Sequence, residues 1–340
     1  MPPAEGADRP HKIFLDCDPG IDDALAIAFA CGHPGLDLRG VSTVAGNVGL
    51  EQTTANALSV LEFIGCPGVP VAAGSPRPLL RPPVEARHVH GDTGLGAAHL
   101  PPALGRPRDT HAVDLLMETV GASPGEVTLV ATGPLTNIAL AVRRYPHLAS
   151  QVARFVIMGG SASRGNVTPA AEFNIACDPE AAAIVFTAGW QVTMVGLDVT
   201  LQARASAAVQ ERMRALGRLG ADLLLPGLSG YRGEDSDPAG PDAPVAGGSL
   251  PSARAAGGGP PVHDVCALAL VAEPALFGCR PARVLVETAG ALTSGMTVTD
   301  FRPGPGECNS LVALSADVPG FWDLVLPAYA RLPAGRDAQR

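Results

Sequence analysis

The stretch Asp16-Cys17-Asp18-Pro19-Gly20-Ile21-Asp22-Asp23 follows the apolar run of residues 13–15 and precedes the apolar residues 24–30. The short run of residues 13–15 is typical of a buried strand, and residues 24–30 have the composition of a buried helix. Pro19-Gly20 predicts a tight turn between them. We therefore expect a strand, a turn and a helix, with four carboxylates gathered at the turn.

Similar short apolar runs recur along the chain and alternate with helical stretches. The expected strands are residues 13–15, 38–44, 69–72, 127–131, 154–158, 191–196 and 283–287, and the expected helices are residues 23–31, 50–64, 112–121, 136–145 and 179–188. This alternation predicts an α/β fold with a mostly parallel central sheet flanked by helices, in the form of a Rossmann-like open sheet. Ligands of such sheets bind beyond the carboxyl ends of the strands, where the acidic turn lies.

One segment breaks the pattern. Residues 226–261 are rich in Gly, Pro, Ser and Ala and have almost no apolar periodicity. This composition predicts a Gly/Pro-rich insertion, which is either a tolerated surface loop or a mobile lid over an active site. Regular patterns resume at His263, so we expect a single domain over residues 1–340 that carries one insertion.

The composition excludes several classes of protein. A net charge of −9 leaves no basic surface for a phosphate backbone, so nucleic acid is not an expected partner. No stretch approaches the roughly 18 apolar residues of a membrane helix, and residues 1–12 lack an apolar signal segment, which favours a cytoplasmic protein away from membranes. The seven cysteines form no Cys-x-x-Cys pair, so we interpret them as buried apolar residues rather than disulfides or metal ligands.

The four carboxylates of the acidic turn indicate a metal site. A carboxylate at the start of a helix is favoured by the helix dipole, but this accounts for one of them. Asp16 and Asp18 alternate along the strand and so share a face. Clustered carboxylates repel one another unless a cation lies among them. Oxygen ligands without nearby His or Cys point to calcium or magnesium rather than zinc.

The Asp-x-Asp-Pro-Gly-x-Asp-Asp run resembles the amino-terminal signature of the inosine-uridine preferring nucleoside hydrolase family. Further segments carry the resemblance in the same order, at residues 44–47, 90–96, 131–137, 158–160, 166–174 and 263–264. They span nearly the whole chain. The resemblance implies the nucleoside hydrolase fold and calcium-dependent hydrolysis of the N-glycosidic bond of ribonucleosides, which gives ribose and a free nucleobase.

The resemblance also implies the roles of the acidic residues. Asp18, Asp23, Asp264 and the backbone carbonyl of Thr132 would bind one Ca²⁺ ion. Calcium suits this role because it accepts roughly 6–8 oxygen ligands in a flexible arrangement, including water and the ribose diol. Asp18 would also be the general base for the attacking water, and Asp16 would orient the ligands from behind.

The substrate-binding positions implied by the resemblance are mostly polar, as the hydroxyls of a sugar require. They are Asp22, Asn47, Met158, Asn166, Glu172, Phe173 and Asn174. His90 and His263 match histidines of the nucleobase pocket, where a proton must reach the leaving base. The two tryptophans lie outside the matched segments, which favours the broader inosine-uridine type over a purine-specific enzyme.

Two alternatives remain. A magnesium phosphotransferase would use the first Asp pair, but it requires a basic phosphate-binding residue after a later strand, and no such Lys is found. A non-catalytic protein that binds nucleoside and calcium would not need the base, and Asp18 is present. The resemblance implies a homodimer or a homotetramer.

Overall fold

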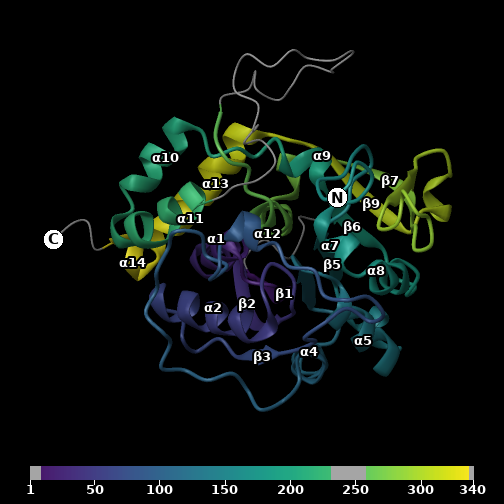
Figure 1. The fold of residues 1–340 in the computed structure, drawn as a ribbon, viewed down its shortest axis with the longest axis horizontal. Coiled ribbons are helices and arrows are strands. Elements are labelled where there is room, and N and C mark those ends of the chain that lie inside the picture. The colour runs from purple at the N-terminus through teal and green to yellow at the C-terminus, as the bar shows by residue number, and fades with distance from the viewer. Residues whose placement is uncertain (1–8, 231–257, 337–340) are drawn as a thin grey trace, which may run out of the picture.

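The computed structural model describes residues 9–230 and 258–336 (Figure 1). The expected insertion over residues 226–261 falls largely outside these ranges. Its first residues belong to helix α11 (Leu225–Gly230), and residues 231–257 are among those that the structure does not describe.

A nine-stranded sheet forms the centre of the molecule, in the order β3-β2-β1-β4-β5-β6-β9-β7-β8. The strands are β1 (His11–Cys17), β2 (Leu36–Thr43), β3 (Val71–Ala73), β4 (Val127–Ala131), β5 (Arg154–Met158), β6 (Val192–Val195), β7 (Phe277–Val286), β8 (Thr297–Asp300) and β9 (Ser310–Ala316). All pairings from β3 to β9 are parallel, whereas β7 pairs antiparallel with both β9 and β8. The expected mostly parallel α/β sheet is confirmed.

Two strands were not expected from the sequence. β9 lies inside the sheet, parallel to β6 and antiparallel to β7, while β8 forms the edge beyond β7. β8 has only four residues, with Thr at alternate positions, and β9 has an apolar run of only four residues between Ser310 and Ser315. A short, partly polar strand lacks the continuous apolar run that marks a strand buried on both faces.

Helices connect the parallel strands. They are α1 (Ile21–Gly32), α2 (Leu50–Phe63), α3 (Arg87–His90), α4 (Ala112–Gly121), α5 (Thr136–Arg144), α6 (Leu148–Gln151), α7 (Phe173–Cys177), α8 (Pro179–Phe186), α9 (Leu197–Thr200), α10 (Ala207–Arg214), α11, α12 (Asp264–Ala272), α13 (Val318–Arg331) and α14 (Pro333–Arg336), with a π-helix over Leu219–Leu224 and 3₁₀ turns at Pro274–Leu276 and Pro305–Glu307. Helix α4 has the bounds expected from the sequence.

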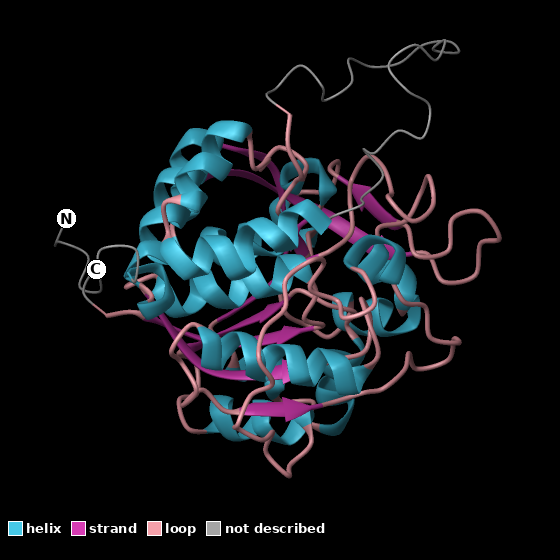
Figure 2. Ribbon diagram, turned by 60° about the vertical axis from the view of Figure 1, so that its left-hand side comes forward, coloured by secondary structure: helices cyan, strands magenta, loops and turns pink. Residues whose placement is uncertain are grey.

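The helices cover both faces of the sheet, as Figure 2 shows. Successive residues of β1 alternate between two apolar cores. Ile13 and Leu15 pack with α1, α2, α12 and α13, whereas Phe14 packs with α4, α5 and α8. This is the period-two pattern of a strand between two helical layers. It explains why residues 13–15 of β1 form a continuous apolar run rather than an alternating one.

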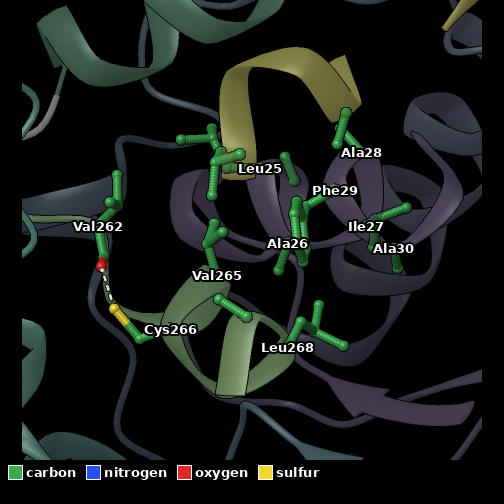
Figure 3. Packing of buried hydrophobic residues seen from close by; sticks show 14 of the residues in the cluster. Leu25, Ala26, Ile27, Ala28, Phe29, Ala30, Val262, Val265, Cys266 and Leu268 are labelled. Carbon is green, nitrogen blue, oxygen red and sulfur yellow. Dashed lines mark hydrogen bonds between the residues drawn. The ribbon is translucent and has the colours of Figure 1, made fainter. Parts of the chain in front are cut away.

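Beyond Asp22 and Asp23 in its first turn, helix α1 is apolar all round, and it is covered on several sides. Every residue of α1 except Cys31 is buried. Leu25 and Phe29 belong to the same apolar cluster as Val265 of α12, part of which Figure 3 draws. From α13, the Tyr329 hydroxyl donates a hydrogen bond of 3.1 Å to the backbone carbonyl of Leu25. The helix that carries two of the acidic residues is therefore fixed inside the protein.

Within residues 9–230 and 258–336, no helix is long and apolar enough to cross a membrane. All seven cysteines are free thiols, and three of them, Cys17, Cys177 and Cys266, are buried.

Candidate active site at the carboxyl ends of the strands

The acidic turn connects the carboxyl end of β1 to α1. Asp18 and Asp23 are fully buried, in spite of their charge. Gly20 allows the turn to pack closely, since a Cβ atom there would lie 2.6 Å from Nδ2 of Asn47 and 2.7 Å from Nδ1 of His90. A side chain at this position would displace two predicted site residues, so the turn requires glycine.

Asp18 has one bonded and one unbonded carboxylate oxygen. Oδ2 accepts a hydrogen bond of 2.7 Å from the backbone N–H of Asn47. Oδ1 is buried and has no hydrogen-bond partner among the described residues. Burial, followed by the negative charge of Asp23, raises the pKa of Asp18 well above its usual range. Such an oxygen is costly to bury unless a ligand or a proton satisfies it.

Asp23 lies at the centre of the cluster. It accepts hydrogen bonds from the backbone N–H of Gly20 at 3.0 Å, from Nδ2 of Asn47 at 3.2 Å and from Oγ1 of Thr132 at 2.8 Å. Its side chain also shares a hydrogen bond with Asp264, the first residue of α12. Burial and the charges of the neighbouring aspartates raise the pKa of Asp264 well above its usual range. Residues 241 positions apart in the sequence thus meet in one carboxylate cluster.

The cluster fits a hard cation by its donor chemistry. Within residues 9–230 and 258–336, no three His, Cys, Asp or Glu side chains converge as a ready set of metal ligands. The fit rests instead on unbonded buried oxygens, namely Oδ1 of Asp18, Oδ1 of Asp22 and Oδ2 of Asp16. Mutually repelling carboxylates with free oxygens, next to a backbone carbonyl, favour calcium or magnesium over softer metals.

The hydrogen bonds of the Asp16 side chain are to Ser42 and Asn137, which are not members of the carboxylate cluster. Its Oδ1 accepts hydrogen bonds of 2.5 Å from Oγ of Ser42 and 2.8 Å from Nδ2 of Asn137. Burial raises the pKa of Asp16 to about 7. Asn137 also donates to the carbonyl of Thr43 and accepts from the N–H of Ser75, so it ties β1 to the end of β2. Asn137 lies in the segment 131–137 that carries the family resemblance, but no role was predicted for it.

Thr132 connects the cluster to the predicted sugar-binding residues. Its backbone carbonyl accepts a hydrogen bond of 2.7 Å from Nδ2 of Asn174, which also donates to the carbonyl of Met158 at 3.0 Å. Glu172 caps α7 by accepting from the N–H groups of Asn174 and Ile175, and it accepts from Gly160 as well. Burial raises the pKa of Glu172 to about 7.

Asn166 and Phe173 lie at the periphery of this network. The only bond between them is from the backbone N–H of Phe173 to Oδ1 of Asn166, at 2.9 Å. Both side chains are half-buried, unlike the fully enclosed aspartates. The structure therefore places these two residues next to Glu172 rather than in the carboxylate cluster.

His90 is held as a neutral ring. The backbone N–H of Ile21 donates to Nδ1 of His90 at 3.2 Å, so the hydrogen of the ring lies on Nε2. Burial, with a smaller contribution from the charge of His263, lowers the pKa of His90 to about 3. The two predicted base-pocket histidines are thus close enough to influence each other.

His263 precedes α12 and contacts two polar residues. Its backbone N–H bonds to the carboxylate of Asp22, whose pKa is raised well above its usual range by burial and by the charge of Asp23. Its Nδ1 lies 2.8 Å from Oγ1 of Thr200 in α9. Thr200 was not predicted from the sequence. Its position just after β6, at the carboxyl end of an expected strand, was the available signal.

Comparisons with known proteins agree on one family. The model of the inosine-uridine preferring nucleoside hydrolase family matches residues 13–323. The inosine-uridine preferring nucleoside hydrolase of Leishmania major is 44% identical over 329 residues, which cover 95% of this chain and 98% of the relative. The non-specific ribonucleoside hydrolase RihC of Salmonella typhi is 44% identical over 326 residues, covering 94% and 98% of the two chains.

Solved structures show the same relationship. The purine-preferring ribonucleoside hydrolase from Gardnerella vaginalis superimposes with a TM-score of 0.83 at 32% identity, over 95% of this chain and 99% of that chain. A plant nucleoside hydrolase superimposes with a TM-score of 0.78, also at 32% identity, over 94% and 99% of the chains. With both its fold and its sequence matching, the chain belongs to the inosine-uridine preferring nucleoside hydrolase family of enzymes.

Proposed function

We propose that the protein hydrolyses the N-glycosidic bond of ribonucleosides in a calcium-dependent reaction, with Asp18 as the general base. The observation that carries the proposal is the buried, unbonded Oδ1 of Asp18 inside a carboxylate cluster at the strand ends. Once the carboxylate is ionised, an oxygen without a hydrogen-bond partner is an available proton acceptor.

Asp18, Asp23, Asp264 and the carbonyl of Thr132 would hold the cation. When bound, calcium supplies positive charge that offsets the carboxylates and polarises its oxygen ligands. Asp18 would then stay in the ionised form that a base requires, because a nearby positive charge favours a carboxylate over its protonated form. Magnesium is the alternative ion with the same oxygen preference.

The protein's own side chains supply the remaining steps of the proposed reaction. Asp18 takes a proton from water as that water attacks the anomeric carbon, while the bond from this carbon to the base nitrogen breaks and its electron pair leaves with the base. Asp22, Asn47, Asn166, Glu172 and Asn174 are the proposed partners of the ribose hydroxyls, and Met158 and Phe173 line the sugar. Nearby carboxylates stabilise the electron-poor ribosyl group.

The leaving base needs a proton, which we assign to His263. His90 has a different role, because its Nδ1 is occupied by the N–H of Ile21 and burial disfavours its charged form. It would serve as a neutral hydrogen-bond donor through Nε2. Asp16 would orient the cluster from behind, through Ser42 and Asn137.

A broad substrate range is supported by the positions of the two tryptophans. Trp190 stacks on Phe155 with ring centroids 4.4 Å apart, and Trp322 of α13 donates to the carbonyl of Arg204. Neither bonds to the carboxylate cluster. We propose inosine and uridine as substrates, and a cytoplasmic homodimer or homotetramer as the working form.

Incubation of the purified protein with inosine or uridine tests the proposal. We expect equal amounts of free ribose and free base, formed only when calcium is present. Nucleoside binding without ribose would favour the non-catalytic alternative, and release of phosphate from phosphorylated substrates would favour the phosphotransferase.

A further inference from the structure

A buried threonine outside the predicted site contacts the proposed proton donor. Thr200 is the last residue of α9, is fully buried, and has its Oγ1 2.8 Å from Nδ1 of His263. Helix α9 follows the carboxyl end of β6, so Thr200 lies at the same end of the parallel strands as the acidic turn. The two residues are 63 positions apart, so this contact depends on the tertiary fold.

Backbone pairing next to this contact fixes the two segments against each other. The N–H of Val262 donates to the carbonyl of Ala203 at 2.9 Å, and the N–H of Ala205 donates to the carbonyl of Pro260 at 2.9 Å. Val262, Ala203 and Ala205 are buried. Because His263 follows Val262 directly, this pairing sets the point at which the chain enters α12.

We propose that Thr200 is a positioning residue, whose hydroxyl holds Nδ1 of His263 so that the opposite ring nitrogen, Nε2, faces the leaving base. The inference rests on the proposed function, in which His263 supplies the proton. A hydroxyl both donates and accepts hydrogen bonds, so the contact persists in either tautomer of the ring. The ring thus keeps its orientation during catalysis, as a proton donor requires.

His90 shows what the threonine hydroxyl adds. Its Nδ1 is held by the backbone N–H of Ile21, a group that only donates. That partner permits a single hydrogen-bonding arrangement of the ring. The Thr200 hydroxyl can either donate to Nδ1 of His263 or accept from it, which suits a histidine that must exchange a proton.

Two substrates separate positioning from a general structural effect. Inosine needs its base protonated, whereas a nitrophenyl riboside leaves as a stable anion. We expect Thr200→Val to lower kcat for inosine by roughly tenfold to a hundredfold, part of the roughly 10²–10⁴-fold that general acid catalysis supplies. KM, and the rate with the nitrophenyl riboside, should stay within about threefold of wild type. Thr200→Ser should restore inosine turnover to within about threefold.

Matched variants make the result decisive. Thr193→Val removes the hydroxyl of a buried threonine in β6 and should leave both substrates unaffected. In the His263→Ala background, Thr200→Val should cause no further loss with inosine. If Thr200→Val does not fold, Thr200→Ala removes the same hydroxyl with less change in shape. Equal losses on both substrates, no loss with inosine, or no rescue by serine would overturn the inference.

His263→Ala alone separates a failure of the proposed role of His263 from a failure of the proposed role of Thr200. A selective loss with inosine supports the proposed role of His263, and Thr200 is then judged by its own variants. Equal losses on both substrates, or none, would contradict the proposed role of His263 itself.

Discussion

The carboxylate of Asp18 and the backbone N–H of Asn47 lie 2.7 Å apart, which joins the end of β1 to the loop after β2. This bond occupies one oxygen of Asp18 and leaves the other unbonded. The loop after β2 therefore sets the direction of the proposed base, and substitutions in that loop should affect catalysis.

Asp18→Asn tests the proposed base directly. The amide oxygen can still accept from Asn47, so the turn should keep its shape, but the amide cannot take a proton from water. We expect kcat to fall by at least the roughly 10²–10⁴-fold that a general base contributes. Steady-state assays with inosine provide the measurement. Asp323→Asn, at an exposed position on α13 (71%), is the matched control and should behave as wild type. Near-normal turnover of Asp18→Asn would place the base elsewhere.

Removal of the metal should reduce stability as well as activity. A cation that binds only the folded protein raises its free energy of unfolding, by about 2.7 kcal/mol when present at a hundred times its Kd. Thermal melts with excess chelator, calcium or magnesium should show the largest increase with calcium. Asp264→Asn should weaken this response. Identical melts in chelator and in calcium would contradict the assignment.

Gly46→Ala should damage the site through a steric contact. A Cβ atom at this position would lie 2.1 Å from Oδ2 of Asp18 and 2.8 Å from Cδ of Pro134, so the carboxylate must move. We expect turnover to fall by more than about tenfold, because small displacements of a catalytic group are costly. The free energy of unfolding should fall by about 1–3 kcal/mol. Gly68→Ala, where a Cβ atom meets nothing within 4 Å, is the control.

His90 should remain neutral far below the usual range of histidine. Its pKa is lowered to about 3, mainly by burial, from an ordinary value of 6.5. The uncharged ring therefore contributes stability that is fully present above pH 6.5 and is lost as the pH falls toward 3. Proton NMR of the ring should show no titration between pH 5 and 8. In His90→Asn, the loss of stability on acidification should be smaller than in wild type.

Much of the fold could be predicted because its strands are buried on both faces. β4 and β5 have the bounds expected from their apolar runs. β8 could not be found in this way because Thr alternates along its four residues, and β9 was missed because its apolar run has only four residues between Ser310 and Ser315. Their place depends on pairing with β7, which lies far from β6 in the sequence and next to β9 in the sheet.

The candidate site shows a similar division. The acidic residues could be recognised because four carboxylates at one turn are unusual without a ligand. Thr200 and Asn137 could not be given a role, since their positions after expected strands do not identify the residues that they bond. Their significance comes from long-range contacts, to His263 across 63 residues and to Asp16 across 121. Sequence periodicity contains no information on such pairs.

The bond between Tyr329 and Leu25 has a consequence for synthesis of the protein. It spans 304 residues, which takes about 15–60 s to translate at roughly 5–20 residues per second. During this interval the apolar α1 has left the ribosome but lacks α13, which covers one of its sides. The inner strand β9 is also among the last elements to be made. A nascent chain that stalls before residue 310 would expose the side of α1 that α13 covers and the edge of β6 that β9 pairs with. We expect such a chain to depend on chaperones or to aggregate.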